Sequence, residues 1–247
     1  PTQGDATVIC PSGFWGFRHQ VGMPLLDALQ ASVSSEIVSS ESPPLAVLFS
    51  TDRALVERAA HLQQLRSLTP RVRMLSGSSR SEEFQILSQT DLSTVYVYGL
   101  VGDGPSDVLY LQIGAPGEQG FIHPADLRAA RINWHGGGPL VFMNPVRAPA
   151  APTGQEPRPE WALDFARSFV TACGAAGVLA PSVPLSEPLA CAFGEECLRR
   201  FFSGMTIGEA VRSARLALLK AGSPLGLSYV QFARNELRLE HGAAQPA

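Results

Sequence analysis

Gly138-Pro-Leu-Val-Phe-Met-Asn-Pro-Val146 is the stretch that decides the fold. Its apolar run, Leu140 to Met143, shows no polar alternation, which is typical of a strand buried on both faces of a parallel sheet. A second run, Val95-Tyr-Val-Tyr-Gly-Leu-Val-Gly102, has the same character. We therefore expect two central strands whose carboxyl ends form a crevice, the usual place for a ligand in an open α/β sheet.

Shorter patterns on either side predict the elements that accompany this pair. Leu45 to Phe49 is a further buried strand, and Asp52 is the expected N-cap of a helix that leaves His61 on its outer surface. Arg71 to Leu75 alternates and fits an edge strand, while Val108 to Ile113 suggests a hairpin extension after the second central strand. Strands and helices thus alternate along the chain, as in α/β domains.

The second half of the chain is mainly helical by its pattern. A helix is expected from Pro159 to Cys173, and Cys197 lies on the apolar stripe of the next one. Thr206-Ile-Gly-Glu209 has the form of a capping box, as does Ser79-Arg-Ser-Glu82 earlier in the chain. Leu227 to Phe232 is the expected closing strand.

These patterns together predict an α/β fold in which a mostly parallel central sheet is covered by helices on both faces. The chain has 247 residues, of which 45% are hydrophobic, and this is enough to bury one substantial core. We expect a single domain over residues 1–240 and a flexible tail over residues 241–247. Because the chain begins with Pro1, we also expect it to be a domain of a longer protein.

Composition excludes several classes of function. The net charge of −3 gives no basic footprint for a phosphate backbone, so we expect no nucleic-acid partner. No run approaches the roughly 20 apolar residues of a membrane span, and no signal-peptide pattern is present, so we expect a cytoplasmic protein without a membrane partner.

The four cysteines, Cys10, Cys173, Cys191 and Cys197, show neither Cys-x-x-Cys spacing nor zinc-type pairing with histidine. Free thiols, no metal and no cofactor are the prediction. Core packing is expected for each of them, because free cysteines are among the most buried residue types.

The two strand ends resemble those of the CHAT domain, a branch of the caspase-like cysteine peptidases related to separase. In that family the first strand end reads approximately Tyr-Phe-Tyr-Cys-His-Gly and supplies the catalytic histidine. The second reads approximately Val-Phe-Leu-Asn-Ala-Cys and supplies the nucleophile. The segments Tyr96-Val-Tyr-Gly-Leu-Val101 and Val141-Phe-Met-Asn-Pro-Val146 are similar to these two motifs. The resemblance implies a caspase-like three-layer sandwich.

Two further motifs extend the resemblance over most of the chain. Cys10-Pro-Ser-Gly-Phe-Trp-Gly-Phe-Arg-His19 is similar to a run that opens many bacterial members. Its aromatic residues Phe14, Trp15 and Phe17 are interpreted as packing beneath a loop. Toward the other end, the run from Phe201 to Arg215 resembles the family's Gly-x-Thr-x-Gly-Glu-Ala-x-Arg-x-Ala-Arg segment.

The resemblance implies that the catalytic groups are missing. Residue by residue, Leu100 stands at the histidine position and Val146 at the cysteine position. A cysteine peptidase needs a thiolate beside an imidazole, and neither leucine nor valine supplies such a group. We therefore predict a catalytically inactive domain that acts as a protein-interaction or scaffolding module in a bacterial signalling or defence protein.

Two alternatives remain open. A displaced dyad would make the chain an active peptidase, with Cys173 or Cys10 acting beside His135. A small-molecule sensor would instead bind a nucleotide or metabolite in the crevice between Gly102 and Arg147.

The residues expected to line the crevice serve both the interaction and the sensor hypotheses. Gly102, Asp103, Asn144 and Arg147 follow or end the two central strands, so we predict that they contact a ligand or a protein partner.

Overall fold

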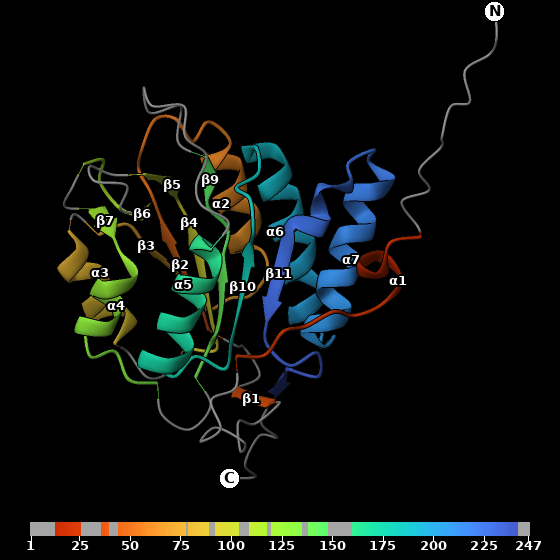
Figure 1. Ribbon diagram of the computed structural model, residues 1–247. Coiled ribbons are helices and arrows are strands. Elements are labelled where there is room, and N and C mark those ends of the chain that lie inside the picture. Colours follow the sequence, from red (N-terminus) through yellow and green to blue (C-terminus); the bar gives the residue numbers. More distant parts are fainter. Residues whose placement is uncertain are drawn as a thin grey trace, which may run out of the picture.

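The computed structural model describes residues 13–25, 36–39, 44–77, 79–88, 92–103, 109–117, 120–134, 138–147 and 160–241. A six-stranded sheet in the order β11-β10-β8-β4-β2-β3 forms its centre (Figure 1). All neighbouring strands are parallel except β11, which is antiparallel to β10. The strands are β2 (Leu45–Phe49), β3 (Val72–Leu75), β4 (Thr94–Tyr98), β8 (Leu140–Met143), β10 (Gly177–Pro181) and β11 (Tyr229–Phe232).

The two central strands, β4 and β8, are apolar on both faces. In β4, Tyr96 and Tyr98 point into one hydrophobic core, while Val95 and Val97 point into the other. Strand β8 does the same with alternating residues, and all of its side chains are buried. This two-sided burial explains why neither strand shows polar alternation.

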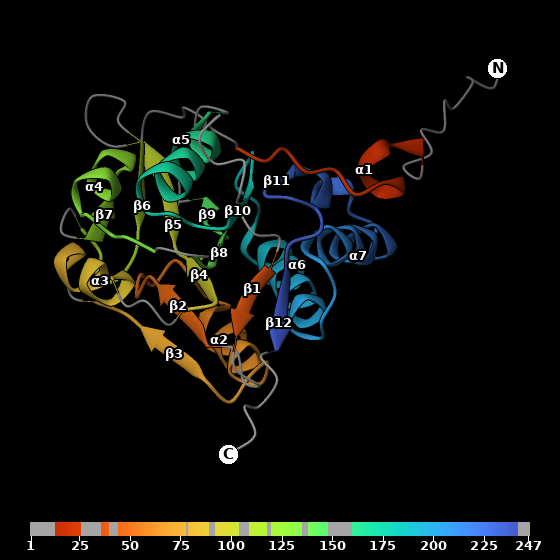
Figure 2. The ribbon, with the colours of Figure 1, turned by 90° about the horizontal axis from the view of Figure 1, so that it is seen from below.

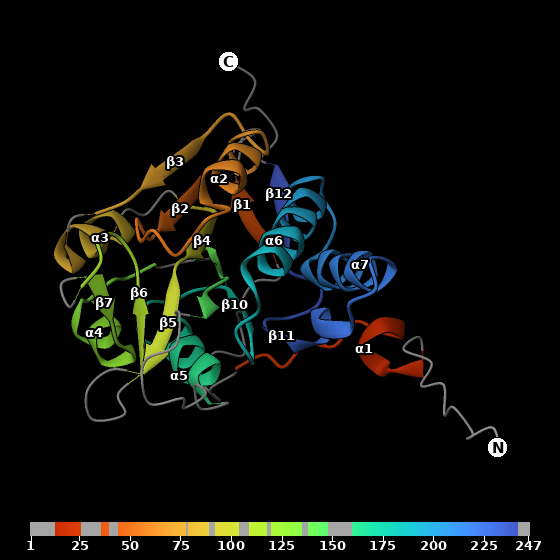
Figure 3. The ribbon, with the colours of Figure 1, turned by 90° about the horizontal axis from the view of Figure 1, so that it is seen from above.

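Helices cover both faces of the sheet, as predicted (Figure 3). Each helical layer closes one of the two cores. One layer consists of α2 (Arg58–Arg66), α6 (Glu187–Phe202) and α7 (Ile207–Lys220); the other consists of α3 (Arg80–Leu87), α4 (Pro124–Ala129) and α5 (Trp161–Arg167), which continues as a π-helix over Ser168–Ala172. None of the helices in the described residues is long and apolar enough to cross a membrane.

Two smaller sheets complete the described part of the chain. The predicted hairpin extension is confirmed and forms part of a four-stranded sheet in the order β7-β6-β5-β9. A parallel pair, β1 with β12, joins distant parts of the sequence (Figure 2). These strands are β1 (Glu36–Ser39), β5 (Leu100–Asp103), β6 (Leu109–Gln112), β7 (Phe121–Ile122), β9 (Val146–Arg147) and β12 (Arg238–His241). His241, expected in a flexible tail, therefore ends β12, and residues 242–247 lie outside the described residues.

The helix expected after β2 starts later than predicted. Asp52 caps a turn instead, since its carboxylate accepts hydrogen bonds from Ala54 N at 2.9 Å and from Gln112 Nε2 at 3.2 Å. Helix α2 begins at Arg58. The N-cap prediction was wrong because Glu187, far away in sequence, accepts the N–H groups immediately before the helix.

The aromatic opening motif lies against α7. In the short helix α1 (Trp15–Arg18), Phe17 is buried, but Trp15 is 77% exposed and Phe14 49% exposed, so their predicted packing was wrong. Two arginines from the run Phe201 to Arg215 bind this segment. Arg212 Nε donates to Phe17 O at 3.1 Å, and Arg215 Nη1 donates to Gly16 O at 3.2 Å.

Glu83, in the first turn of α3, is fully buried beside Gly77 and Gly114. Among the described residues neither of its carboxyl oxygens has a hydrogen-bond partner. Burial, with a smaller contribution from the neighbouring Glu82, raises the pKa of Glu83 from 4.5 to about 8. The side chain is therefore a neutral acid at pH 7.

Substitution Glu83→Gln should remove a pH dependence of folding stability. Since the folded protein keeps a proton that the unfolded chain releases above about pH 4.5, the wild type loses stability as the pH rises from there to about 8. The loss is at most about 1.4 kcal/mol per pH unit. Urea unfolding at pH 5, 6, 7 and 8 should show this slope in the wild type and a flatter profile in the variant. Parallel profiles would contradict the assignment.

Candidate functional site

The candidate site lies where β4 and β8 leave the central sheet. After Tyr98 the chain bends at Gly99, where any side chain would collide with the carbonyl oxygen of Gln112, and continues as β5. After Met143 it continues as β9. Strands β5 and β9 pair again in parallel, with Leu100 opposite Val146 and the Val146 N–H donating to Gly99 O at 2.8 Å. The two strand ends are therefore hydrogen-bonded neighbours and do not form separate walls of an open crevice.

Aliphatic side chains fill this position. Leu100 is 2% exposed and Val146 is 7% exposed. Leu185 forms a bridge to Val146 and is buried in the same core. We call Leu100, Val146 and Leu185 the strand-end cluster. None of the three can accept a proton or attack a carbonyl, so the cluster itself can provide only apolar contacts.

The predicted binding residues occupy different environments. Arg147, at the end of β9, is exposed, whereas Gly102 lies in β5 with the Tyr110 hydroxyl close by. The backbone of Asp103 ends β5. Asn144 is fully buried, and its amide points into the protein. Of Asn144 and Arg147, the two predicted binding residues whose side chains the structure describes, Arg147 is at the surface and Asn144 is not.

Asn144 is the centre of a buried polar network that the sequence did not indicate. Its Nδ2 donates to Tyr96 Oη at 2.5 Å and to Ala190 O at 2.8 Å. Its Oδ1 accepts a hydrogen bond from the Tyr229 hydroxyl. Burial raises the pKa values of both tyrosines well above 10, so both hydroxyls stay protonated. The amide thus joins β4, β8, β11 and α6.

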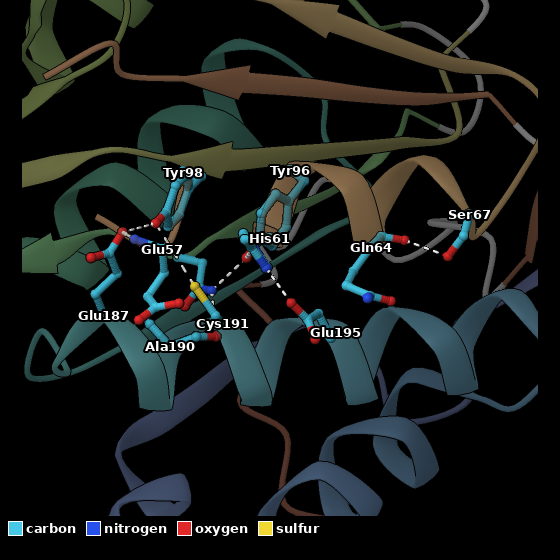
Figure 4. Close-up of polar contacts among 11 residues, drawn as sticks. Glu57, His61, Gln64, Ser67, Tyr96, Tyr98, Glu187, Ala190, Cys191 and Glu195 are labelled. Carbon is cyan, nitrogen blue, oxygen red and sulfur yellow. Dashed lines mark hydrogen bonds and ion pairs between the residues drawn. The ribbon is translucent and has the colours of Figure 1, made fainter. Parts of the chain in front are cut away.

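The network continues to His61 of α2 (Figure 4). His61 Nε2 lies 2.8 Å from Tyr96 Oη, and Nδ1 lies 2.7 Å from Glu195 Oε1. The residue is 1% exposed, so its predicted position on the helix surface was wrong. One signal was available: His61 precedes Leu65 by four residues and therefore shares the buried face of the helix.

A second polar contact lies beside the strand-end cluster. The Tyr98 hydroxyl donates to Glu187 Oε1, and the same carboxylate accepts the N–H groups of Val56 and Glu57 at 2.9 and 3.0 Å. Cys191 Sγ lies 3.8 Å from Tyr98 Oη (Figure 4). Burial raises the pKa of Tyr98 far above its ordinary value. Glu187 thereby fixes the start of α6 to the loop before α2.

The described cysteines are poor nucleophiles. Cys173, Cys191 and Cys197 are buried and free, as predicted. Burial raises the pKa of Cys173 to about 12 and that of Cys191 to about 12, and it also raises the pKa of Cys197. At neutral pH these groups are thiols.

Cys173, one cysteine of the displaced-dyad hypothesis, lies at the other end of the sheet from the strand-end cluster. Cys173 O accepts a hydrogen bond from Trp134 N just before β10 begins, at the edge of the sheet opposite the strand-end cluster. Cys10 and His135, the other members of that hypothesis, lie outside the described residues. In the described part of the chain, no group of three or more His, Cys, Asp or Glu side chains could hold a metal ion.

Known structures share this architecture. The chain is similar to the Arg-specific cysteine proteinase gingipain R, with a TM-score of 0.52 and 10% identity over 79% of this chain and 47% of that one. It is also similar to the complex of the pro- and mature domains of RgpB from Porphyromonas gingivalis, with a TM-score of 0.54 and 10% identity over 79% and 48%. The fold is caspase-like. The three-layer α/β architecture predicted from the sequence is therefore confirmed.

A sequence relative matches almost the whole chain. Over 255 residues, the chain is 32% identical to a probable protease, Ga0334635_1659, of Vitiosangium sp. (strain GDMCC 1.1324). The match includes 99% of this chain but only 32% of the relative, so the chain spans about a third of that protein's length. No protein-family model matches the chain.

Introducing a cysteine and a histidine at the paired strand ends tests whether these positions can form a dyad. In the double variant Leu100→His/Val146→Cys, we expect the new thiol to alkylate about tenfold faster at pH 7 than in Val146→Cys alone, because an adjacent imidazole lowers a thiol pKa. Mass spectrometry of iodoacetamide-treated protein measures the rate, with Cys10→Ser as the background. The matched control Leu100→Asn/Val146→Cys should gain nothing. Equal rates in all three variants would show that the geometry does not support a dyad.

Proposed function

We propose that this chain is a catalytically inactive peptidase-fold domain that serves as a protein-interaction or scaffolding module within a larger bacterial signalling or defence protein. Leu100 and Val146 are proposed to stand where related peptidases carry histidine and cysteine. The observation that carries the proposal is the pairing of these two buried aliphatic residues at the ends of β4 and β8.

Two further observations support the loss of peptidase activity. A thiol nucleophile needs both access and a lowered pKa, whereas the described thiols are buried and have raised pKa values. His61 has Nδ1 beside the Glu195 carboxylate and directs its other ring nitrogen at a tyrosine hydroxyl rather than at a sulfur. Free thiols in this part of the chain also suit the proposed cytoplasmic setting.

The proposed interaction surface is the exposed side of the strand ends, near Arg147. A partner there is either a fused domain or a separate protein. The length of the Vitiosangium relative favours a fused domain, since about two thirds of that protein lies outside the match.

An active peptidase is the rival function, and the description of the Vitiosangium relative as a probable protease favours it. That function would require a thiol outside the described residues, of which Cys10 is a candidate.

The two functions differ in thiol reactivity. Treatment of the chain with a thiol-directed activity probe and a panel of peptides should give no turnover and slow labelling at Cys173, Cys191 and Cys197, because their thiols are buried. Single Cys→Ser variants serve as controls. Peptide turnover that disappears on replacing any one of the four cysteines would refute the proposal.

The interaction role is tested by photo-crosslinking in the full-length protein. A benzoylphenylalanine replacing exposed Arg147 should crosslink to a discrete partner segment, either in the same polypeptide or in another protein. The same group replacing exposed Lys220, on α7, should give no such product. Identical crosslinks from both positions, or none from Arg147, would contradict an interface at the strand ends.

A further inference from the structure

The buried network around Asn144 has a single consistent direction of hydrogen bonding. The Ala190 carbonyl can only accept, so the Asn144 atom beside it must be the NH₂ group. Asn144 Oδ1 then accepts from the Tyr229 hydroxyl, and Nδ2 donates to the Tyr96 oxygen. Tyr96 must therefore give its own proton to the remaining neighbour, His61 Nε2.

The same donors and acceptors determine the protonation state of His61. Its Nε2 accepts from Tyr96, so it carries no proton, while Nδ1 carries the proton and donates it to the Glu195 carboxylate. Every member of the chain Tyr229, Asn144, Tyr96, His61 and Glu195 is satisfied only when the imidazole is neutral. A proton added at Nε2 would leave the Tyr96 hydroxyl between two donors, without an acceptor for its hydrogen.

We propose that His61 is a pH-sensitive switch: its protonation breaks the Asn144 network and loosens the carboxyl end of β8 beside the strand-end cluster. Asn144 lies between Met143, the last residue of β8, and Pro145-Val146, and its amide anchors this turn from the side. The backbone bonds from Asn144 N to Val97 O and from Val146 N to Gly99 O, both 2.8 Å, hold the same turn. The inference holds whether or not this end of the sheet binds a partner.

Three carboxylates lie around His61. Glu195 on α6 is partly exposed and contacts Nδ1, and the carboxylates of Glu57 and Glu187 lie in the same cluster (Figure 4). Arg58, the cation next to Glu57, turns away and donates to the carbonyls of Ser50 and Asp52.

The other titratable neighbours stay neutral. Tyr96, Tyr98 and Tyr229 have pKa values raised by burial, as does Cys191.

Hydrogen exchange of the intact chain at pH 7.0 and pH 5.5 tests the switch. Ordinary imidazoles have pKa values between these two pH values, and ordinary carboxyl groups have lower pKa values. Glu83 remains largely protonated at both pH values. After correction for intrinsic exchange, we expect protection of the amides of Asn144 and Val146 to fall about tenfold at pH 5.5, the effect of one buried hydroxyl left unsatisfied.

Three variants assign the effect. His61→Gln offers Tyr96 an acceptor that does not titrate, and Tyr96→Phe removes the hydroxyl that conflicts with the added proton, so neither should respond to pH. His19→Gln, which replaces an exposed histidine, should respond as the wild type does. An unchanged wild type, or an equal response in His61→Gln, would overturn the proposal.

A measurement on the wild type covers the case in which the variants fail to fold. Nitrogen-15 spectra of the imidazole at pH 7.0 should show a protonated Nδ1 and a bare Nε2 for His61, with conversion to the doubly protonated ring accompanying the loss of protection. A protonated Nε2 at pH 7.0 would overturn the proposed direction of the network.

Discussion

The parallel pairing of β4 with β8 is the constraint on which the rest of the structure depends. Each strand offers large side chains to both faces, so each requires a helical layer on either side. The pairing does not end with the central sheet. Beyond Gly99 and Asn144 the same two segments pair again as β5 and β9, which brings Leu100 and Val146 together. The pairing of β4 with β8 thus determines where the strand-end cluster lies.

Much of the fold followed from patterns in the sequence. Unbroken apolar runs identified the buried strands, because a two-sided environment leaves no room for polar alternation. The capping box at Thr206 was also recognisable and is confirmed, with reciprocal bonds to Glu209. Helix α2 was placed too early because its start is capped by Glu187, a residue about 130 positions away. Local sequence carries no information on a partner at such a distance.

The site was harder to predict than the fold. The adjacency of Leu100 and Val146 was expected from the resemblance, but their hydrogen-bonded pairing was not. Polar residues were misjudged for a physical reason: a buried histidine looks like a surface residue until its partners are known, and His61 finds them in Tyr96 and Glu195. The rings of Phe14 and Trp15 were misjudged in the opposite sense, since apolar character does not ensure burial in a helix of one turn.

The pairing of β1 with β12 has a consequence for the order of folding. Ile37 lies opposite Leu239, so one of the earliest described strands finds its partner among the last described residues. Strand β11, an edge of the central sheet, also arrives late. In a nascent chain, the core beneath α2, α6 and α7 would therefore stay incomplete until β11 and β12 had been synthesised. Topologies rich in such long-range pairings fold slowly and expose apolar surface until the last strands pair.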